Sequence, residues 1–316
     1  MTSKNALLDF PPSFQRGIGG VLRSALFALV GISGVSARAG APLEEKPPER
    51  PESLLGFPLV VESYAEVDFL QESPSVPSGL LRRAKVSLPL FYPIWSNVRL
   101  LGSLSAKVSD YESAPFDADG LTLWDLSATA LANVDFNKQW SATVGFLGSA
   151  SFEEGADISE SMNGGALAMV GYRWSDTLQT SIGGLYLSRT GEDPLIVPAI
   201  GVEYQPCKAF QFSIRGLQAR AQWLWSDRWE GFWRAEWNPF GPRLRSRPNT
   251  PVISFQDNST RTGLGIAFHP RKMWTVSLES GVVFHKIETH DADRNVVGKD
   301  TLDPAAYIGA HVSARF

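Results

Sequence analysis

The sequence predicts an all-β chain that forms a transmembrane, antiparallel, up-and-down β-barrel of about fourteen strands, with twelve as the alternative count. Three observations support this prediction. Apolar and polar residues alternate over runs of roughly ten residues from about residue 60 onward, short turns and longer loops alternate between the runs, and tryptophans lie beside the short turns.

The alternation is clear in residues 121–136, where Trp124 and Leu126 fall on even positions and Asp125 and Ser127 on odd ones. Successive side chains of a strand point to opposite faces, so one face of each run is apolar and the other is polar. Runs of this length match the 9–11 residues that a tilted strand needs to cross a bilayer. The expected strands lie near residues 60–70, 80–90, 96–109, 121–136, 140–152, 164–174, 178–189, 194–205, 208–215, 217–226, 229–237, 261–269, 273–286 and 304–316.

The connections also alternate. Short turns are expected after the even-numbered strands, near residues 91–95, 137–139, 175–177, 205–208, 226–228 and 269–272. Mostly longer loops follow the odd-numbered strands, at 71–79, 110–120, 153–163, 238–260 and 287–303. Short turns on one side and long loops on the other, with both ends of the barrel on the short-turn side, are typical of outer-membrane barrels.

Tryptophan and tyrosine favour the boundary between lipid and water. Six tryptophans lie beside the expected short turns and predict one aromatic girdle: Trp95, Trp140, Trp174, Trp225, Trp229 and Trp274. A soluble β-sandwich is the alternative, because it also alternates. A sandwich hides its apolar face against a second sheet and rarely places so many tryptophans at turn edges, so the barrel is favoured.

Residues 1–39 are typical of an export signal, because basic residues precede an apolar run of about 13 residues and Ala37 and Ala39 form an A-x-A cleavage site. We expect cleavage, since the run is shorter than a membrane-spanning helix; a retained helix is the alternative. Residues 40–58 are rich in Pro and Glu and predict a flexible periplasmic linker, with a plug or a partner-binding strand as the alternative. The barrel then occupies residues 59–316, in the bacterial outer membrane.

The last expected strand alternates up to its end, and its final residue, Phe316, resembles the terminal signature that the barrel assembly machinery reads. Ala314 departs from the bulky residue common at its position. The resemblance implies two partners, the assembly machinery and the lipids of the outer membrane.

Residues 60–316 resemble a family of uncharacterised, porin-like bacterial outer-membrane β-barrels. The resemblance rests on LTLWDLSATALANVDFNKQWSATVGF, GALAMVGYRWSDTLQTSIGGLYL and PLIVPAIGVEYQPCKAFQFSI. It implies the fold and the location and adds no catalytic residues.

If the apolar face meets lipid, the polar face lines the interior. A barrel of this size is wider than one that side chains fill alone, so we expect a porin-like passive channel for small polar solutes. The alternative is a structural or surface-interaction barrel, in which acids of the first strand pair with bases of the second and occlude the lumen. The charged residues expected to line the lumen are Glu62, Glu66, Asp68, Arg83, Lys85, Arg99, Lys107, Asp125, Asp135, Arg215, Arg220, Arg234, Glu236 and Glu279.

In two segments the sequence does not determine whether the side chains point into the lumen or to the outside. The longest loop carries Arg243, Arg245 and Arg247, which either form a constriction or lie on the surface; surface exposure is favoured. The alternation breaks at 178–189, where apolar residues occupy both parities.

Other functions have little support in the sequence. A net charge of -4 and a pI of about 5.7 give no basic surface for nucleic acid. The single cysteine excludes an internal disulfide, no spacing fits a metal site, and no cofactor motif occurs. His311 and Ser313 share one face of the last strand and leave a lipid hydrolase as a remote alternative, but by parity that face is the lumen. We therefore expect no enzyme and leave the oligomeric state open.

Overall fold

The computed structural model describes residues 60–70, 79–112, 120–189, 192–245, 252–271, 273–293 and 295–315. The expected export signal, the linker, Arg247 and Phe316 lie outside the described residues. The strands are β1 (Val60–Leu70), β2 (Gly79–Trp95), β3 (Val98–Tyr111), β4 (Leu121–Asp135), β5 (Trp140–Glu153), β6 (Met162–Arg173), β7 (Leu178–Arg189), β8 (Glu192–Cys207), β9 (Phe210–Arg215), β10 (Gln218–Ser226), β11 (Trp229–Phe240), β12 (Ser254–Arg271), β13 (Trp274–His290), β14 (Val296–Thr301) and β15 (Ala305–Arg315), with a short 3-10 helix, η1 (Ser159–Ser161).

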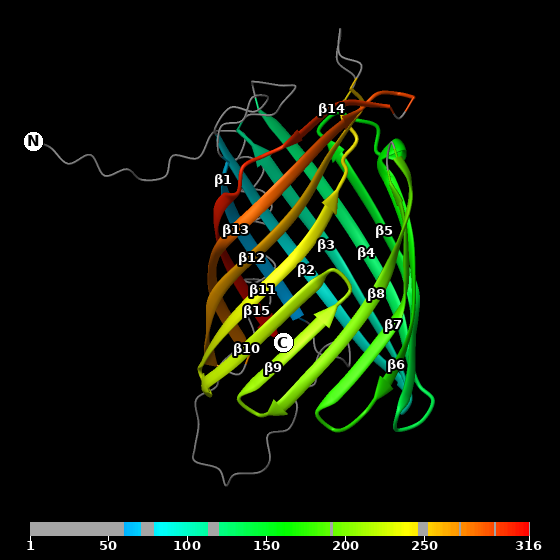
Figure 1. Ribbon diagram of the computed structural model, residues 1–316, viewed down its shortest axis with the longest axis vertical. Coiled ribbons are helices and arrows are strands. Elements are labelled where there is room, and N and C mark those ends of the chain that lie inside the picture. Colours follow the sequence, from blue (N-terminus) through cyan, green and yellow to red (C-terminus); the bar gives the residue numbers. More distant parts are fainter. Residues whose placement is uncertain are drawn as a thin grey trace, which may run out of the picture. The chain divides into compact units, whose positions relative to one another are not determined.

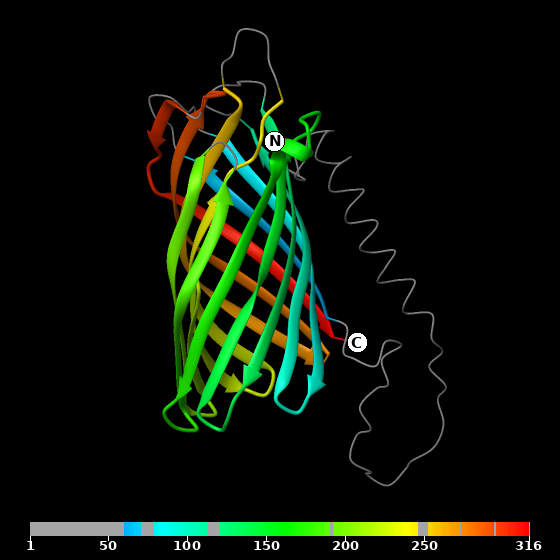
Figure 2. The same ribbon diagram turned by 90° about the vertical axis from the view of Figure 1, so that its right-hand side faces the viewer.

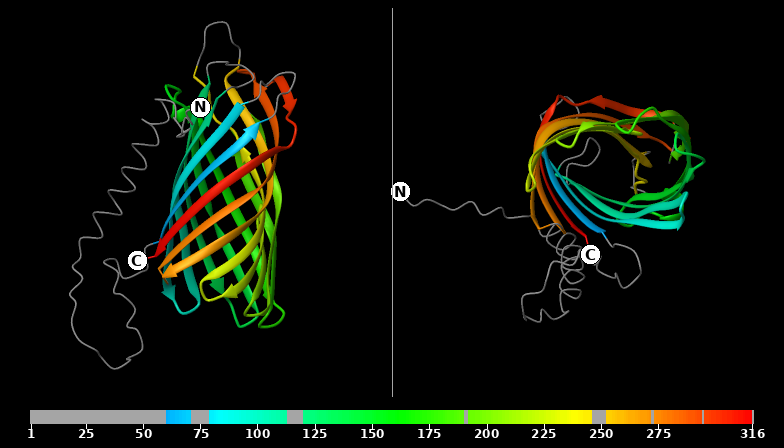
Figure 3. Two further views of the ribbon diagram at one scale, coloured as in Figure 1. Left: turned by 90° about the vertical axis from the view of Figure 1, so that its left-hand side faces the viewer. Right: turned by 90° about the horizontal axis from the view of Figure 1, so that it is seen from below.

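These strands form one closed antiparallel barrel (Figures 1 and 2). Each strand from β1 to β13 pairs with the next, β13 pairs with β15, and β15 pairs with β1. The end-on view in Figure 3 shows the resulting ring. Of the fifteen strands, β14 pairs only with β13, so fourteen strands make the wall and the predicted count is confirmed.

Tight turns lie at one end of the barrel, which we call the short-turn end, and include 96–97, 136–139, 174–177 and 227–228. The opposite end, the loop end, carries longer connections such as 241–253. One connection at the loop end is also short: Gly216, with φ of 60°, joins β9 to β10. The β9–β10 hairpin therefore ends part-way along the wall and covers only its half toward the short-turn end.

The main error in the predicted strands is at β12. The sequence predicts a loop over 238–260, but β11 continues to Phe240 and β12 begins at Ser254. The physical reason is that residues 256–260 are polar on both faces, so this part of the strand lacks the apolar alternation that marks the others. The predicted loop 287–303 also contains β14, and β13 continues to His290.

The outer surface of the barrel is apolar. Ile182, Ile196, Phe146 and Leu264 are 70%, 75%, 73% and 65% exposed, respectively. Exposed apolar side chains in a continuous band require an apolar solvent. Within the described part of the chain, no helix is long and apolar enough to cross a membrane.

Candidate functional site: the barrel interior

The strand register identifies the side chains that point inward, because directly opposed residues share a face. Arg83 of β2 contacts Asp257 of β12, and the strands β1, β15 and β13 lie between these two in the wall. Such a contact crosses the interior, so the face that carries Arg83 is the inner face. Register extends this face around the ring, and the structure places all fourteen charged residues predicted to line the lumen on it.

The strongest electrostatic feature is a buried cluster around Arg83, whose side chain is 5% exposed. Its guanidinium nitrogens lie 2.8 Å from Glu66, 2.5 Å from Asp68 and 3.2 Å from Asp257. Arg261 of β12 pairs with the second oxygen of Glu66. Charge-assisted contacts of this kind are strong only where each buried charge has a partner, and this geometry provides one for each.

His285 completes this cluster. Its Nδ1 lies 2.8 Å from Asp257 and its Nε2 lies 3.3 Å from Asp68. Tyr111 donates a hydrogen bond of 2.7 Å to Asp257. Three carboxylates face two guanidinium groups in the cluster, and His285 balances the third negative charge when it is protonated. We call Glu66, Asp68, Arg83, Asp257, Arg261 and His285 the inner charge cluster.

A second network continues toward the short-turn end. Arg234 of β11 pairs with Glu279 of β13, and the Tyr64 hydroxyl of β1 bonds to Glu279 at 3.1 Å. The Arg234 guanidinium lies 5.4 Å from the centre of the Tyr64 ring, a cation–π distance. This network joins strands on both sides of β15.

The loop end above the inner charge cluster is filled by apolar side chains. Tyr111 and Phe255 meet edge to face with ring centres 5.4 Å apart, and Leu244 of the β11–β12 loop is 3% exposed among them. These residues belong to a core whose other members include Leu81, Leu123, Ile287 and Leu302. This part of the interior is closed.

The β11–β12 loop crosses the barrel mouth. The Arg243 N–H donates to the Ser151 carbonyl at 2.8 Å, and the Glu153 N–H donates to the Arg243 carbonyl at 2.9 Å, so the loop joins β5 on the far wall. The Arg243 side chain pairs with Glu160 at 2.5 Å. Arg245 pairs with Glu153 at 3.0 Å and is 55% exposed. Of the predicted loop arginines, Arg243 thus lies in the crossing segment and Arg245 reaches the surface.

A cavity of about 290 Å³ lies below the inner charge cluster. It is lined from both sides of the barrel, with Glu62 and Lys85 on β1 and β2 and Glu236 on β11. Among the described residues, these three charged side chains make no ion pair. The other charged lining residues are Arg83, Lys107, Arg234 and Arg261.

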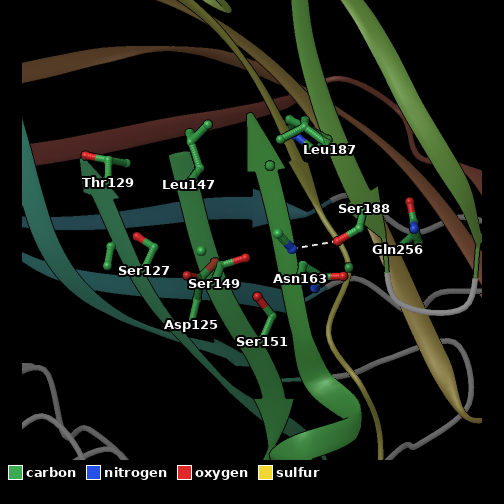
Figure 4. Close-up of a pocket in the computed structure, with 16 residues that line it drawn as sticks. Asp125, Ser127, Thr129, Leu147, Ser149, Ser151, Asn163, Leu187, Ser188 and Gln256 are labelled. Atoms are coloured by element: carbon green, nitrogen blue, oxygen red, sulfur yellow. Dashed lines mark hydrogen bonds between the residues drawn. The ribbon is translucent and has the colours of Figure 1, made fainter. Parts of the chain in front are cut away.

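A second cavity of about 220 Å³ lies nearer the loop end, against the opposite wall (Figure 4). Asp125, Ser127 and Ser149 line it from β4 and β5, and Leu187 lines it from β7. Pro239 closes it from β11. This cavity is therefore bounded by both the polar and the apolar parts of the inner face.

The remaining predicted lumen residues form local pairs between neighbouring strands. Arg99 lies 2.6 Å from Asp135, Arg215 lies 2.8 Å from Glu203, Arg220 lies 2.9 Å from Glu230 and Lys107 lies 3.5 Å from Asp125. The sequence alternative, in which acids of β1 pair with bases of β2, holds for Glu66 and Asp68 with Arg83. It does not hold for Glu62 and Lys85.

All six predicted girdle tryptophans lie at strand ends or in turns at the short-turn end. Trp95, Trp174 and Trp225 are 68%, 64% and 65% exposed. Tyr172 lies between Trp140 and Trp174, with ring centres 4.8 and 4.7 Å away, so part of the girdle is a continuous aromatic strip.

The described residues offer little support for hydrolase chemistry or metal binding. His311 and Ser313 lie on the inner face, away from lipid. No group of three potential ligands among the described residues is arranged to hold a metal ion. Cys207 is a free, exposed thiol at the short-turn end.

Sequence reasoning missed several interior residues. Asp257 lay in the predicted loop and Arg261 lay beside it. Asp257, Ser259 and Arg261 occupy every second position, which is the signal of one polar strand face. Tyr64 and Tyr111 were also missed, because tyrosine is found on both the apolar and the polar faces of alternating strands. Its position in the pattern therefore does not show that its hydroxyl bonds inside the barrel.

A closed antiparallel barrel with an apolar exterior, an aromatic girdle at its short-turn end and a charged interior has the architecture of an outer-membrane β-barrel. No family model matches the sequence, and no curated protein matches it.

Several solved structures have a similar fold. One is an outer-membrane channel from Pseudomonas putida F1, with a TM-score of 0.44, 7% identity and coverage of 86% of this chain and 100% of that one. The translocator domain of the autotransporter NalP from Neisseria meningitidis has a TM-score of 0.39 and 13% identity, covering 96% and 98% of the two chains. The Pseudomonas putida toluene transporter TodX has a TM-score of 0.36 and 10% identity, covering 82% and 88%. The likeness is one of fold alone.

Proposed function

We propose that the protein is a passive outer-membrane channel for small polar solutes. The observation that carries the proposal is the cavity between opposite walls, in which Glu62, Lys85 and Glu236 remain unpaired with other described side chains. Charges that are not neutralised by a neighbour act on passing ions and polar solutes. An interior built only for structure would pair them, since isolated charges contribute no stability.

The inner charge cluster and the apolar core close one side of the interior at the loop end. The solute path therefore runs along the β4–β7 wall, past the crossing segment at Arg243, and widens into the cavity toward the short-turn end. The crossing segment acts as the constriction, and the mixed charges below it set a weak ion preference.

The test is single-channel conductance of the refolded protein in planar bilayers with a salt gradient. We expect steady conductance, and Lys85→Glu moves the reversal potential toward cation preference because it reverses an unpaired charge in the path. Lys138→Glu is the matched control, since Lys138 is exposed in the 136–139 turn outside the cavity. A folded but silent barrel, or equal shifts from both variants, would contradict the proposal.

A further inference from the structure

The wall of the barrel is interrupted between β8 and β11. β9 pairs with β8 only from Gly201 toward the short-turn end, and β10 pairs with β11 only up to Glu236. Residues 192–200 of β8 and 237–240 of β11 thus extend beyond the β9–β10 hairpin, with no described strand between them. Figure 1 shows the hairpin ending part-way up the wall between its two neighbours. We call this interruption the notch.

On the β8 side of the notch, proline reduces the number of backbone N–H groups that have no strand to bond to. The Gln205 N–H bonds to the Thr177 carbonyl, in the turn that precedes β7. Odd residues of β8 therefore direct their backbone groups to β7, and even residues direct theirs to the notch. One of these even residues, Pro198, has no N–H to satisfy, and Pro194 lies in the irregular pairing beyond Leu195. Proline is tolerated in sheets at edges of this kind.

The β11 side shows the same adaptation. The Trp237 N–H bonds to the Leu217 carbonyl, so the odd residues of β11 face β10 and, beyond it, the notch. The next odd residue is Pro239. Prolines on both sides remove some of the donors that an added strand would need, which makes strand addition at the notch less favourable.

The notch lies at the depth of the hydrocarbon. Outward side chains of β8 include Tyr204, Ile200 and Ile196, which are 40%, 51% and 75% exposed. With a rise of about 3.3 Å per residue and a tilt of roughly 40°, the eight steps from Tyr204 to Ile196 span about 20 Å of the bilayer normal. An open sheet edge at this depth is tolerated only where it is buried in protein or lines a water-filled cavity.

The inner face beside the notch is apolar, unlike the charged inner face of β1–β3 and β11–β13. The register places Leu167 of β6, Leu185 of β7 and Val197 of β8 in one inward row. The adjacent inward row contains Leu147, Leu187 and Leu195. The cavity of about 220 Å³ reaches from Leu187 to Pro239, that is, from the strand beside β8 to the far edge of the notch.

We propose that the notch is a lateral portal, through which apolar or amphipathic small molecules pass between the barrel interior and the membrane hydrocarbon. The apolar rows guide the molecule, and the crossing segment at Arg243 directs it from the mouth toward the β5–β8 wall. This function goes beyond the polar path proposed above, because it adds an exit from that side of the interior through the wall into the membrane.

The first test measures lipid access to the inner face. A fluorescent label is placed on single cysteines at Val197, Leu167 and Ile196 in a Cys207→Ser background, and the protein is refolded into vesicles of phosphatidylcholine with brominated acyl chains. Val197 and Leu167 occupy the same inward row, but Leu167 has complete wall on both sides, and Ile196 points into lipid. We expect quenching at Val197 and Ile196 and none at Leu167. Quenching at Ile196 alone shows a sealed wall, and quenching at all three shows lipid throughout the lumen; either result overturns the proposal.

The second test measures passage. The protein is expressed in the outer membrane of a Gram-negative host with an intact lipopolysaccharide leaflet, and uptake of the apolar dye N-phenyl-1-naphthylamine is followed by fluorescence. We expect expression to speed uptake, Val197→Trp to abolish the gain and Leu167→Trp to retain it. No gain, or a gain unaffected by Val197→Trp, overturns the proposal. Conductance of the same variants reports on the polar path, so failure of the portal and failure of the channel are distinguishable.

Discussion

Two arginine–glutamate pairs in the barrel have the same closest distance and different surroundings. The closest nitrogen–oxygen distance is 2.8 Å both for Arg83 with Glu66 and for Arg215 with Glu203. The first pair is 5% and 1% exposed, whereas the second is 67% and 48% exposed. Substitution of each arginine by methionine separates the effect of burial from the effect of distance.

The expected cost differs because Arg83→Met leaves carboxylates buried without their main cation. Glu66 keeps Arg261, but Asp68 and Asp257 keep only His285 as a charged partner. Removing one partner of a buried ion pair costs about 3–5 kcal/mol, whereas an exposed pair contributes about 0–1 kcal/mol. We therefore expect Arg83→Met to lower the free energy of unfolding by at least about 2 kcal/mol more than Arg215→Met.

The assay is reversible urea unfolding in lipid vesicles, followed by tryptophan fluorescence and extrapolated linearly to zero denaturant. The same measurement at acid pH adds a check. Protonation neutralises the buried carboxylates in the variant and removes the pairs in the wild type, so the difference between the two proteins shrinks as the pH falls. Equal costs for both arginines at neutral pH, or a penalty at Arg83 that grows in acid, would refute this reasoning.

Two further predictions concern the wall and the mouth. A Cβ on Gly183 would lie 1.9 Å from the Ala168 carbonyl oxygen, whereas a Cβ on Gly184 would meet nothing within 4 Å. Gly183→Ala should therefore destabilise the barrel by about 1–3 kcal/mol and Gly184→Ala by less than about 0.5 kcal/mol, as measured by urea unfolding; equal effects would show that the strands separate freely. At the mouth, Arg243→Ala removes the ion pair to Glu160, so we expect higher or noisier single-channel conductance, and Glu160→Ala should reproduce it. Unchanged conductance in both variants would show that the crossing segment is held by its backbone hydrogen bonds alone.

The sequence predicts the barrel and its strand count because both faces of most strands meet a solvent of defined polarity. Lipid outside and water inside impose a period of two on strands such as β4. The turns are then predicted where this alternation stops. The prediction fails at the first half of β12, where Asp257, Ser259 and Arg261 point inward and their neighbours Asn258 and Thr260 are also polar. Without contrast between the faces, a strand and a polar loop have the same pattern.

The inner apolar rows escape sequence prediction for the opposite reason. Around Leu185 and Val197 both faces are apolar, so parity does not identify the inside. The structure resolves it by register, with Ile182 and Tyr186 outward and Leu185 and Leu187 inward. Pairing across the interior, as between Arg83 and Asp257, is likewise invisible to local pattern because it depends on the curvature of the closed wall.

The closure of the ring by β1 and β15 has a consequence for biogenesis. Most strands pair with their neighbours in sequence, but this seam joins Val60 to Arg315. Contacts between distant residues carry the largest loop-closure entropy and form late. A translation product that stops before β15 would leave β1 and β13 as two bare edges, which hydrocarbon does not tolerate and which other chains readily join. The seam thus makes completeness of the chain a condition for a closed wall.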